Sequence, residues 1–411
     1  MLLLALSSTT APGTASANPP PPPRWAASDL APGVQQLLSI RPGLVVHAAR
    51  VTAGAPVALQ PVVAYDRVGG GHAPNHGRQP TSELCSRVGG IVCVNADFFN
   101  CPTCGQAAGG LVDKGRPLRS FRHNYPQVSV VDDRLTMDPL TWKGTVRATA
   151  GSTTVELPIA SLNRGPARNG ISLYSAEWGP STPQRRGQLE VVLSTGGPLV
   201  PGLVHAMPVK RRPGSGGIPR DGVVLSAHGT AAATLDRFID VWKTTAGSRR
   251  FVLDTALSFP AKLSVGGRPR LLQDGRRLSL DQRDGMVVRR HPRTVLGWTQ
   301  AGDLLLVTID GRRSGYSNGA TLAEATSLLL ELGAVDAVNL DGGGSATFTI
   351  RCARGACVRN RPSDGRERPV PLALAVVPVS TSRTATLVSA STLATRARAR
   401  VAAVLDRLPL R

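Results

Sequence analysis

Two short runs in the segment 303–350, each predicted to form a strand, are followed by an acidic side chain. Leu304–Ile309 is rich in β-branched residues and is followed by Asp310, and the run 335–340 is followed by Asp341. The first run is continuously apolar, which is typical of a strand buried on both faces. Carboxylates at strand ends can stabilise an oxocarbenium-like state or move protons, as paired carboxylates do in glycoside hydrolysis. Asp310 and Asp341 are therefore candidate catalytic groups.

The residues between the two runs predict a helix. Thr321 and Glu324 fit a capping box, Gly333 fits a C-terminal cap, and apolar residues recur between them at helical spacing. If the two strands are parallel, a right-handed crossover brings Asp310 and Asp341 to one edge of the sheet, where open α/β sheets bind ligands. We therefore expect an α/β fold, with α+β as the alternative. In it, a mixed sheet carries the site on a βαβ unit.

The loop after the second run has glycine at three successive positions, 342 to 344, followed by Ser345. Without side chains, backbone amides can approach a ligand closely and hold an anion such as phosphate. A plain turn is the competing interpretation, because neither a Walker-type lysine nor a G-x-G-x-x-G pattern accompanies the loop.

Several short motifs in a fixed order connect these segments to a known family. They are Asn95-Ala96-Asp97-Phe98-Phe99, Arg293-Thr294-Val295-Leu296-Gly297-Trp298, Asp310-Gly311-Arg312, Gly319-Ala320-Thr321-Leu322-Ala323-Glu324, Asn339-Leu340-Asp341-Gly342-Gly343-Gly344-Ser345 and Asn360-Arg361-Pro362-Ser363-Asp364-Gly365. In this order the chain resembles the phosphodiester glycosidase family over about residues 90–375. Ala320 stands where methionine is common and Asp97 where glycine is common, and about 125–250 carries no matching motif.

The resemblance implies a hydrolase that cleaves sugar-1-phosphodiester linkages of the N-acetylglucosamine-phosphate type, or related exopolysaccharide and cell-wall linkages. The alternative is a non-catalytic protein that binds phosphosugars or exopolysaccharide during envelope assembly. A phosphate monoester leaves as a weak base, so cations and amides that hold the phosphate matter more than strong protonation of the departing oxygen.

Each motif residue then has an expected role. Asp341 is expected at the anomeric carbon, with Asp310 and Glu324 as partners in acid–base work or hydroxyl binding. Substrate and phosphate contacts are expected from Arg312, Arg293, Asn95, Asn339, Gly342, Gly343, Gly344, Ser345 and Arg368.

Each of these roles has a structural alternative. Glu324 could only cap its helix, and the two aspartates could be turn residues. Asn95 and Asn339 could bond backbone at strand ends, and Asp97 is a weaker candidate than Asn95. His123 and His228 are further candidate proton carriers.

The net charge of +21 is carried mostly by arginine, because lysine occurs only at positions 114, 143, 210, 243 and 262. Arginine-rich usage is typical of a GC-rich coding sequence, and the functional alternative is attraction to a polyanion such as a phosphate-bearing cell-wall polymer. The basic residues are scattered without interleaved aromatics, so nucleic acid is not expected as a partner. Acidic strand ends could hold a divalent ion, but no complete metal-ligand set is legible, and no cofactor is expected.

The remaining features concern export and domain organisation. Residues 1–17 resemble a signal peptide with a truncated basic region, and 18–24 form a proline-rich spacer. We expect a catalytic domain over 25–379, with its motif core at 290–375 and a strand-rich insertion at about 125–250. The basic tail 380–411 could dock on an anionic surface, or be a solvated helix or disordered. The oligomeric state is left open.

Six cysteines in three local groups favour disulfides in an oxidising compartment. The local pairing scheme is Cys85 with Cys93, Cys101 with Cys104, and Cys352 with Cys357. A redox pair or half of a zinc site is the alternative for Cys101 and Cys104. The mature protein is expected to be secreted or associated with the cell envelope.

Overall fold

The computed structural model describes residues 24–379 except 71–72, 100–104 and 248. The expected signal peptide, most of the spacer, Cys101, Cys104 and the C-terminal tail lie outside these residues. Within the described part, no helix is both long enough and apolar enough to cross a membrane.

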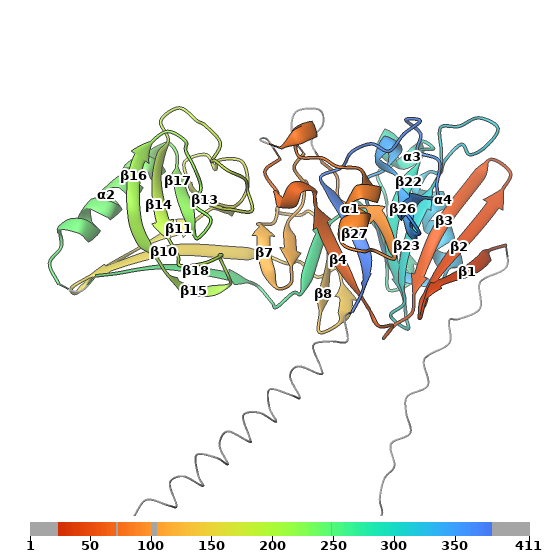
Figure 1. Cartoon of the computed structure of the whole chain (residues 1–411), viewed down its shortest axis with the longest axis horizontal. Helices are drawn as coiled ribbons and strands as arrows, with labels where there is room; N and C mark the ends of the chain where they lie inside the picture. Colours follow the sequence, from red (N-terminus) through yellow and green to blue (C-terminus); the bar gives the residue numbers. More distant parts are fainter. Residues whose placement is uncertain (1–23, 71–72, 100–104, 248, 380–411) are drawn as a thin grey trace, which may run out of the picture.

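The fold is mostly β, with 45% of the residues in strands and 13% in helices, so the expected α/β fold with a βαβ unit is wrong. Among the described strands, every pair is antiparallel except β12 with β13. The described strands form five separate sheets. Figure 1 shows them as a body that contains both the first and last strands and a lobe at the other end of the molecule.

The largest sheet has eight strands in the order β1-β2-β3-β23-β22-β24-β20-β21. Their bounds are Ala26–Ala31, Val34–Arg41, Leu44–Val51, Leu304–Ile309, Arg293–Thr299, Ala334–Asn339, Arg270–Gln273 and Arg276–Arg277. Helix α4 (Leu322–Glu331) covers one face, and the short helix α3 (Gly285–Val288) packs against α4. The predicted capping box of α4 is confirmed, with Thr321 and Glu324 bonding each other's backbone amides.

Strand β23 shows why the sequence pattern misled. Its side chains alternate between two cores: Leu305 and Val307 join the cluster under α4, whereas Leu304 and Leu306 join the cluster on the opposite face. The apolar run therefore does mark a strand buried on both faces, but a helix and a second sheet cover an antiparallel strand here.

Strand β22 lies between β23 and β24 and is antiparallel to both. Strands β23 and β24 consequently run in the same direction without pairing. Asp310 and Asp341, which follow them, lie at the same end of the sheet, although no adjacent parallel pair places them there.

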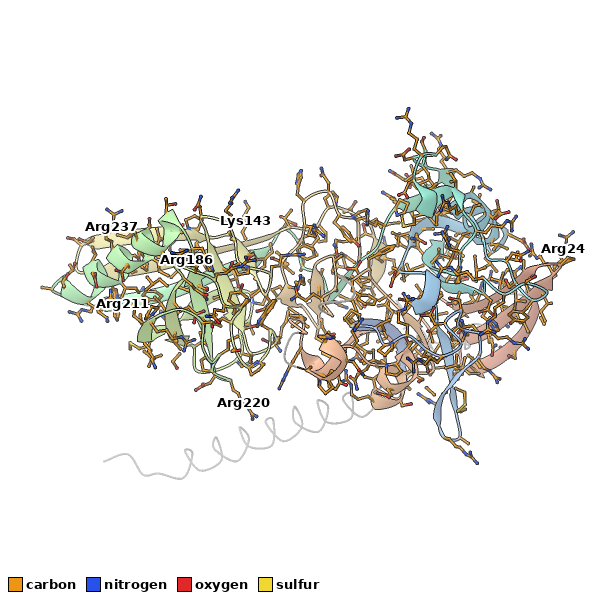
Figure 2. All side chains as sticks on the ribbon, turned by 90° about the horizontal axis from the view of Figure 1, so that it is seen from above. Arg24, Lys143, Arg186, Arg211, Arg220 and Arg237 are labelled. Atoms are coloured by element: carbon orange, nitrogen blue, oxygen red, sulfur yellow. A yellow bond between two sulfur atoms is a disulfide. The ribbon has the colours of Figure 1, made fainter. Side chains whose placement is uncertain are left out.

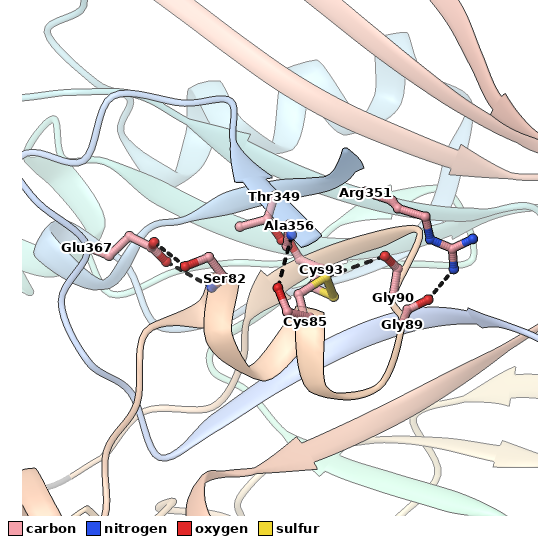
Figure 3. The surroundings of a disulfide bond; sticks show 10 residues. Ser82, Cys85, Gly89, Gly90, Cys93, Thr349, Arg351, Ala356 and Glu367 are labelled. Atoms are coloured by element: carbon pink, nitrogen blue, oxygen red, sulfur yellow. Dashed lines mark hydrogen bonds between the residues drawn. A yellow bond between two sulfur atoms is a disulfide. The ribbon is translucent and has the colours of Figure 1, made fainter. Parts of the chain in front are cut away.

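The second sheet has the order β26-β25-β5-β27-β4, with bounds Gly355–Val358, Phe348–Cys352, Val92–Asn95, Leu372–Pro378 and Val57–Val63. Helix α1 (Thr81–Arg87) packs on it, and the disulfide Cys85–Cys93 joins this helix to β5 (Figure 3). The disulfide Cys352–Cys357 closes the β25–β26 hairpin. These two of the three predicted pairs are confirmed, and the third lies outside the described residues.

A third sheet, of five strands, stands between these two sheets and the lobe. Its order is β7-β6-β19-β8-β9, with bounds Arg116–Arg119, Leu111–Asp113, Leu263–Gly266, Gln127–Val131 and Arg134–Thr136. Short 3₁₀ turns lie at Ala64–Asp66, Pro74–His76 and Gly343–Ser345.

The lobe consists of two sheets and one helix, and the long strands β10 and β18 lead into it (Figure 1). One sheet has the order β11-β10-β18-β15, with bounds Thr153–Ile159, Trp142–Ala150, Arg249–Leu257 and Gly202–His205. The other has the order β12-β13-β17-β14-β16, with bounds Ser161–Leu162, Ile171–Ser175, Gly222–Ala227, Leu189–Ser194 and Met207–Pro213.

Helix α2 (Thr230–Thr244) seals the lobe's own core. Leu235, Phe238, Ile239 and Trp242 recur at helical spacing and are buried against β10 and β17. Basic side chains such as Lys143, Arg186, Arg211 and Arg237 point outward from the lobe (Figure 2). Some of this charge is neutralised locally, because Arg211 forms ion pairs with Asp236 and Asp240.

Candidate functional site

A cleft of about 220 Å³ opens at the end of the large sheet where β23 and β24 finish. It gathers many of the residues expected at the site from the sequence. Its lining consists of Phe98, Met286, His291, Arg293, Arg312, Asn339, Asp341, Gly342, Gly343, Gly344 and Arg368. Among these lining residues, Asp341 is the one acidic side chain.

Asp341 is fixed in place by the neighbouring sheet. Its amide donates to the carbonyl of Ala96 at 2.9 Å, and the Nδ2 of Asn95 donates to its carbonyl oxygen at 2.6 Å. Its Oδ1 accepts from the amide of Gly342 at 2.9 Å. The backbone is therefore anchored on both sides, while the carboxylate faces the cleft.

The pKa of Asp341 is raised to about 6, chiefly because burial disfavours the charged carboxylate. The Ser345 hydroxyl, the Gly342 amide and the positive charge of Arg368 oppose that shift, and the negative charge of Asp97 adds to it. A carboxyl with this pKa is ionised at neutral pH but holds its proton in mildly acidic solution.

Asp97 lies behind Asp341 and is 2% exposed. Its Oδ1 accepts from the Tyr125 hydroxyl at 2.7 Å and its Oδ2 from the amide of Gly109 at 2.6 Å. Burial raises its pKa to about 6 against these hydrogen bonds. The sequence interpretation gave Asp97 less weight than Asn95, yet its charge acts on the cleft carboxylate whereas the side chain of Asn95 is bonded within the protein.

Arg293 lies in the floor of the cleft and is 2% exposed. Its guanidinium donates to the carbonyls of Ala320, Met286 and Arg289 at 2.9, 2.6 and 2.8 Å. Burial, and then the like charge of Arg312, lower its pKa to about 10, so it is still cationic at neutral pH. No ion pair joins Arg293 to a carboxylate within the described residues. A buried cation held this way favours an anionic ligand.

Arg312 reaches the cleft from a backbone with φ of 58°, in the left-handed region that few side chains adopt. Its Nη2 lies 3.2 Å from the Nδ1 of His291. Burial and then the charge of Arg293 lower the pKa of His291, so the ring is neutral at pH 7. A neutral ring accepts the Arg312 proton at Nδ1 and carries its own proton on Nε2, which is a donor.

Arg368 completes the basic side of the cleft. It pairs with Asp364, with Nη2 2.7 Å and Nε 2.9 Å from Oδ2. Asp364 thereby orients the guanidinium toward the glycine loop, where both side chains lie against Gly344.

The glycine loop is predicted to hold an anion through its backbone amides, and in the structure two of these amides have acceptors within the protein. The Gly342 amide donates to Asp341 and the Gly343 amide to the carbonyl of Pro292. Instead, the glycines make room for the arginines: a Cβ on Gly343 would lie 3.2 Å from Arg312 Nη2, and one on Gly344 would overlap the Arg368–Asp364 pair. The structure thus places guanidinium groups where the sequence suggested backbone amides.

Asp310 and Glu324 do not line the cleft. Asp310 is 1% exposed and accepts from Tyr316, Asn360 and the amide of Arg361. Glu324 completes the capping box and pairs with Arg290. In the structure both carboxylates take part in hydrogen bonds that hold the fold beside the cleft.

Three further predicted contact residues take different positions. Asn95 is fully buried and bonds protein groups, as its structural alternative foresaw. The buried Ser345 lies behind the loop and does not line the cleft. Asn339 lines the cleft while its Nδ2 donates to the carbonyl of Arg268 at 2.8 Å, and its buried Oδ1 has no hydrogen-bond partner among the described residues.

His291, Phe98 and Met286 line the cleft but were not among the predicted site residues. His291 and Phe98 could have been found, because His291 stands two residues before Arg293 and Phe98 lies inside a recognised motif. His123 and His228, the predicted proton carriers, do not line the cleft. Within the described residues, no cluster of three or more His, Cys, Asp or Glu could hold a metal ion.

Comparison with known proteins supports the resemblance seen in the motifs. Residues 201–377 match the model of the phosphodiester glycosidase family, which confirms the likeness inferred from the sequence. This segment contains every cleft-lining residue except Phe98.

Two curated relatives match shorter segments. An uncharacterized SPbeta prophage-derived protein of Bacillus subtilis is 41% identical over 81 residues, which is 20% of this chain and 12% of the relative. The N-acetylglucosamine-1-phosphodiester alpha-N-acetylglucosaminidase of Bos taurus is 43% identical over 58 residues, 14% of this chain and 11% of the enzyme. The matches therefore span about a tenth of each relative.

A crystal structure of a hypothetical protein from Synechocystis shows the same fold. It superposes with a TM-score of 0.65 at 21% identity, covering 86% of this chain and 64% of the other.

The close contact between Gly344 and the Arg368–Asp364 ion pair predicts that one added methyl group weakens anion binding. In Gly344→Ala the new Cβ displaces the Arg368–Asp364 pair, so we expect inorganic phosphate to bind about fivefold more weakly or worse, measured by isothermal titration calorimetry. Gly197→Ala is the matched control, because nothing lies within 4 Å of its Cβ. Equal affinity in the two variants would contradict a role for Arg368 in anion binding.

The raised pKa of Asp341 predicts a pH-dependent stability difference. Below its ordinary pKa of 3.8 both folded and unfolded states hold the proton, and above about 6 neither does. Between these values the folded state binds more protons, so the wild type loses stability relative to Asp341→Asn as pH rises. We expect the difference in free energy of unfolding to change by about 2 kcal/mol from pH 4 to pH 6.5 and then level off. Urea unfolding across this range measures it, and a pH-independent difference would show that the pKa is ordinary.

Proposed function

We propose that this chain is an exported hydrolase that cleaves sugar-1-phosphodiester linkages of the N-acetylglucosamine-phosphate type, in cell-wall or exopolysaccharide substrates. The observation that carries the proposal is the composition of the cleft, with one carboxylate facing three guanidiniums. The family match over 201–377 supports the reaction class. The two disulfides support an oxidising compartment.

The arginines act on the phosphate. Arg293 and Arg312 lie in the cleft without a carboxylate partner in the described part of the chain, and Arg368 is oriented by Asp364. Guanidinium groups bind phosphate oxygens in pairs and stabilise the charge that builds on them as the sugar departs. A leaving phosphate therefore needs no strong acid, which fits a cleft whose lining contains a single carboxyl group.

Asp341 acts on the sugar. Its carboxylate, ionised above pH 6, stabilises the oxocarbenium-like state at the anomeric carbon, either by activating water or by attacking that carbon. The bond between the anomeric carbon and its bridging oxygen breaks, and that oxygen stays on phosphorus as a phosphate monoester. Water supplies the new anomeric hydroxyl; its proton passes to Asp341 where Asp341 activates the water, and to solvent where water hydrolyses a covalent Asp341 intermediate.

Two neighbouring side chains suit the sugar. The half-buried ring of Phe98 offers an apolar surface at the rim, and the unpartnered Oδ1 of Asn339 offers an acceptor for a hydroxyl or amide proton. Neither group holds a charge, so both are matched to the neutral part of the substrate.

Asp341→Asn tests the proposal against a panel of α- and β-linked sugar-1-phosphodiesters, with release followed by phosphorus and proton NMR. We expect turnover by the parent to fall at least 10³-fold in the variant while phosphate affinity stays within about threefold. The rate of the parent should rise with pH and reach a plateau above about 6.5, because the ionised carboxylate is the active form.

Glu324→Gln provides the control, since this carboxylate caps a helix outside the cleft and should leave turnover within about twofold. Saturable sugar-phosphate binding without turnover across the whole panel would instead support a phosphosugar-binding protein.

A further inference from the structure

A second group of basic side chains adjoins the cleft beyond Phe98. The guanidinium of Arg268 lies 5.4 Å from the centre of the Phe98 ring, and the carbonyl of Arg268 accepts from Asn339 at 2.8 Å. Phe98 and Asn339 both line the cleft. Arg268 therefore contacts two cleft residues: its backbone carbonyl bonds Asn339, and its side chain lies over Phe98.

Arg122 extends this basic group along Tyr125. The Tyr125 ring lies against Gly266, where an added Cβ would lie 2.7 Å from a ring carbon, and its hydroxyl donates to Asp97. Burial raises the pKa of the Tyr125 hydroxyl, and the positive charges of Arg268 and Arg122 both act in the opposite direction. The Tyr125 amide also donates to the carbonyl of Arg122 at 3.3 Å, so both arginines lie near one fixed residue.

These two arginines are exposed and carry uncompensated charge. No ion pair joins Arg268 or Arg122 to a carboxylate within the described residues, unlike Arg211 and Arg290, which pair with acids. The negative charge nearby belongs to Asp97, which is buried and bonded to Tyr125 and Gly109. Arg164 adds further positive charge behind them, bonded to the carbonyls of Ser120 and Gly109.

We propose that Arg268 and Arg122 form a second anion subsite that holds the neighbouring phosphate of a phosphate-bearing glycopolymer while the first phosphate lies in the cleft. The inference rests on the proposed function and narrows its substrate class from small phosphodiesters to polymers with repeated charge. Phe98, between the two sites, then contacts the sugar that links the two phosphates.

The neighbourhood of the subsite favours a glycopolymer over nucleic acid. Of the two aromatic rings here, Tyr125 is packed on Gly266 and bonded to Asp97, which leaves Phe98 as a single ring for a ligand. Successive bases of a single strand need open ring faces on which to stack. Spaced charge beside a sugar-sized cleft suits alternating phosphates and sugars instead.

The test compares two ligands in the Asp341→Asn background, so that binding is read without turnover. One is a sugar-1-phosphodiester with a methyl aglycone, and the other is the same ligand with a second phosphate on a hydroxyl of its sugar. We expect the second ligand to bind about fivefold to tenfold more tightly at low salt, with a steeper loss of affinity as salt rises. In Arg268→Gln/Arg122→Gln the ratio of the two affinities should fall toward one.

Arg220→Gln is the control, because this exposed arginine lies on the lobe (Figure 2) and should preserve the ratio. Equal affinity for the two ligands in the Asp341→Asn background, or an unchanged ratio in the double variant, would overturn the second subsite. Equally tight binding of a single-stranded oligonucleotide of matched charge would overturn the glycopolymer assignment.

Turnover of the methyl substrate by the parent chain is measured separately. Its absence counts against the proposed hydrolase and leaves the affinity ratio intact as a readout of the subsite.

Discussion

The side chain of Asn95 joins the two sheets that meet at the cleft, and the position of Asp341 depends on it. Its Nδ2 donates to the carbonyl of Asp341, and its Oδ1 accepts from the hydroxyl of Thr294 on β22 and from the amide of Thr347 before β25. The residue is fully buried, so each of these bonds forms away from competing water. A side chain that lost one of them would leave a buried polar group unsatisfied. The constraint fixes the carboxylate and the glycine loop relative to β22, which carries Arg293.

The electrostatics of the cleft follow from this fixed frame. Arg293 donates its hydrogen bonds to backbone carbonyl groups. These bonds orient the guanidinium, and its positive charge is not neutralised by a carboxylate in the described part of the chain. Arg312 is added from a loop and Arg368 from a second one, and the glycines at 343 and 344 let both approach. The resulting positive field surrounds a carboxyl group whose burial outweighs that field and raises its pKa. A ligand with an anionic and a neutral part satisfies both halves of the site.

The sequence predicted local features well where a single physical requirement determines the residue pattern. The capping box at Thr321 and both described disulfides depend on contacts between near neighbours in the chain. The arginines of the cleft were found through motif resemblance, since nothing in their spacing shows that three separate segments converge. The surroundings of Asp310 could not be predicted for the same reason: its hydrogen-bond donors, Tyr316, Asn360 and Arg361, come together only in the folded chain.

The predicted fold class was wrong for a different reason. A continuous apolar strand shows that both faces are covered, but it does not show what covers them or which strand pairs with it. The insertion of β22 between β23 and β24 is a long-range choice that depends on the whole sheet. Asp341 was nevertheless placed at the correct edge, because strands separated by one antiparallel neighbour end on the same side.

The central claim is that the cleft breaks the bond on the sugar side of the bridging oxygen, with phosphate as the leaving group. Hydrolysis of a sugar-1-phosphodiester in ¹⁸O-labelled water tests it most directly, because phosphorus NMR resolves phosphate that has acquired the heavy isotope. The account predicts unlabelled phosphate monoester and label in the anomeric hydroxyl. Label in the phosphate would show attack at phosphorus, and would contradict the assignment of Asp341 to the anomeric carbon and of the arginines to a leaving group.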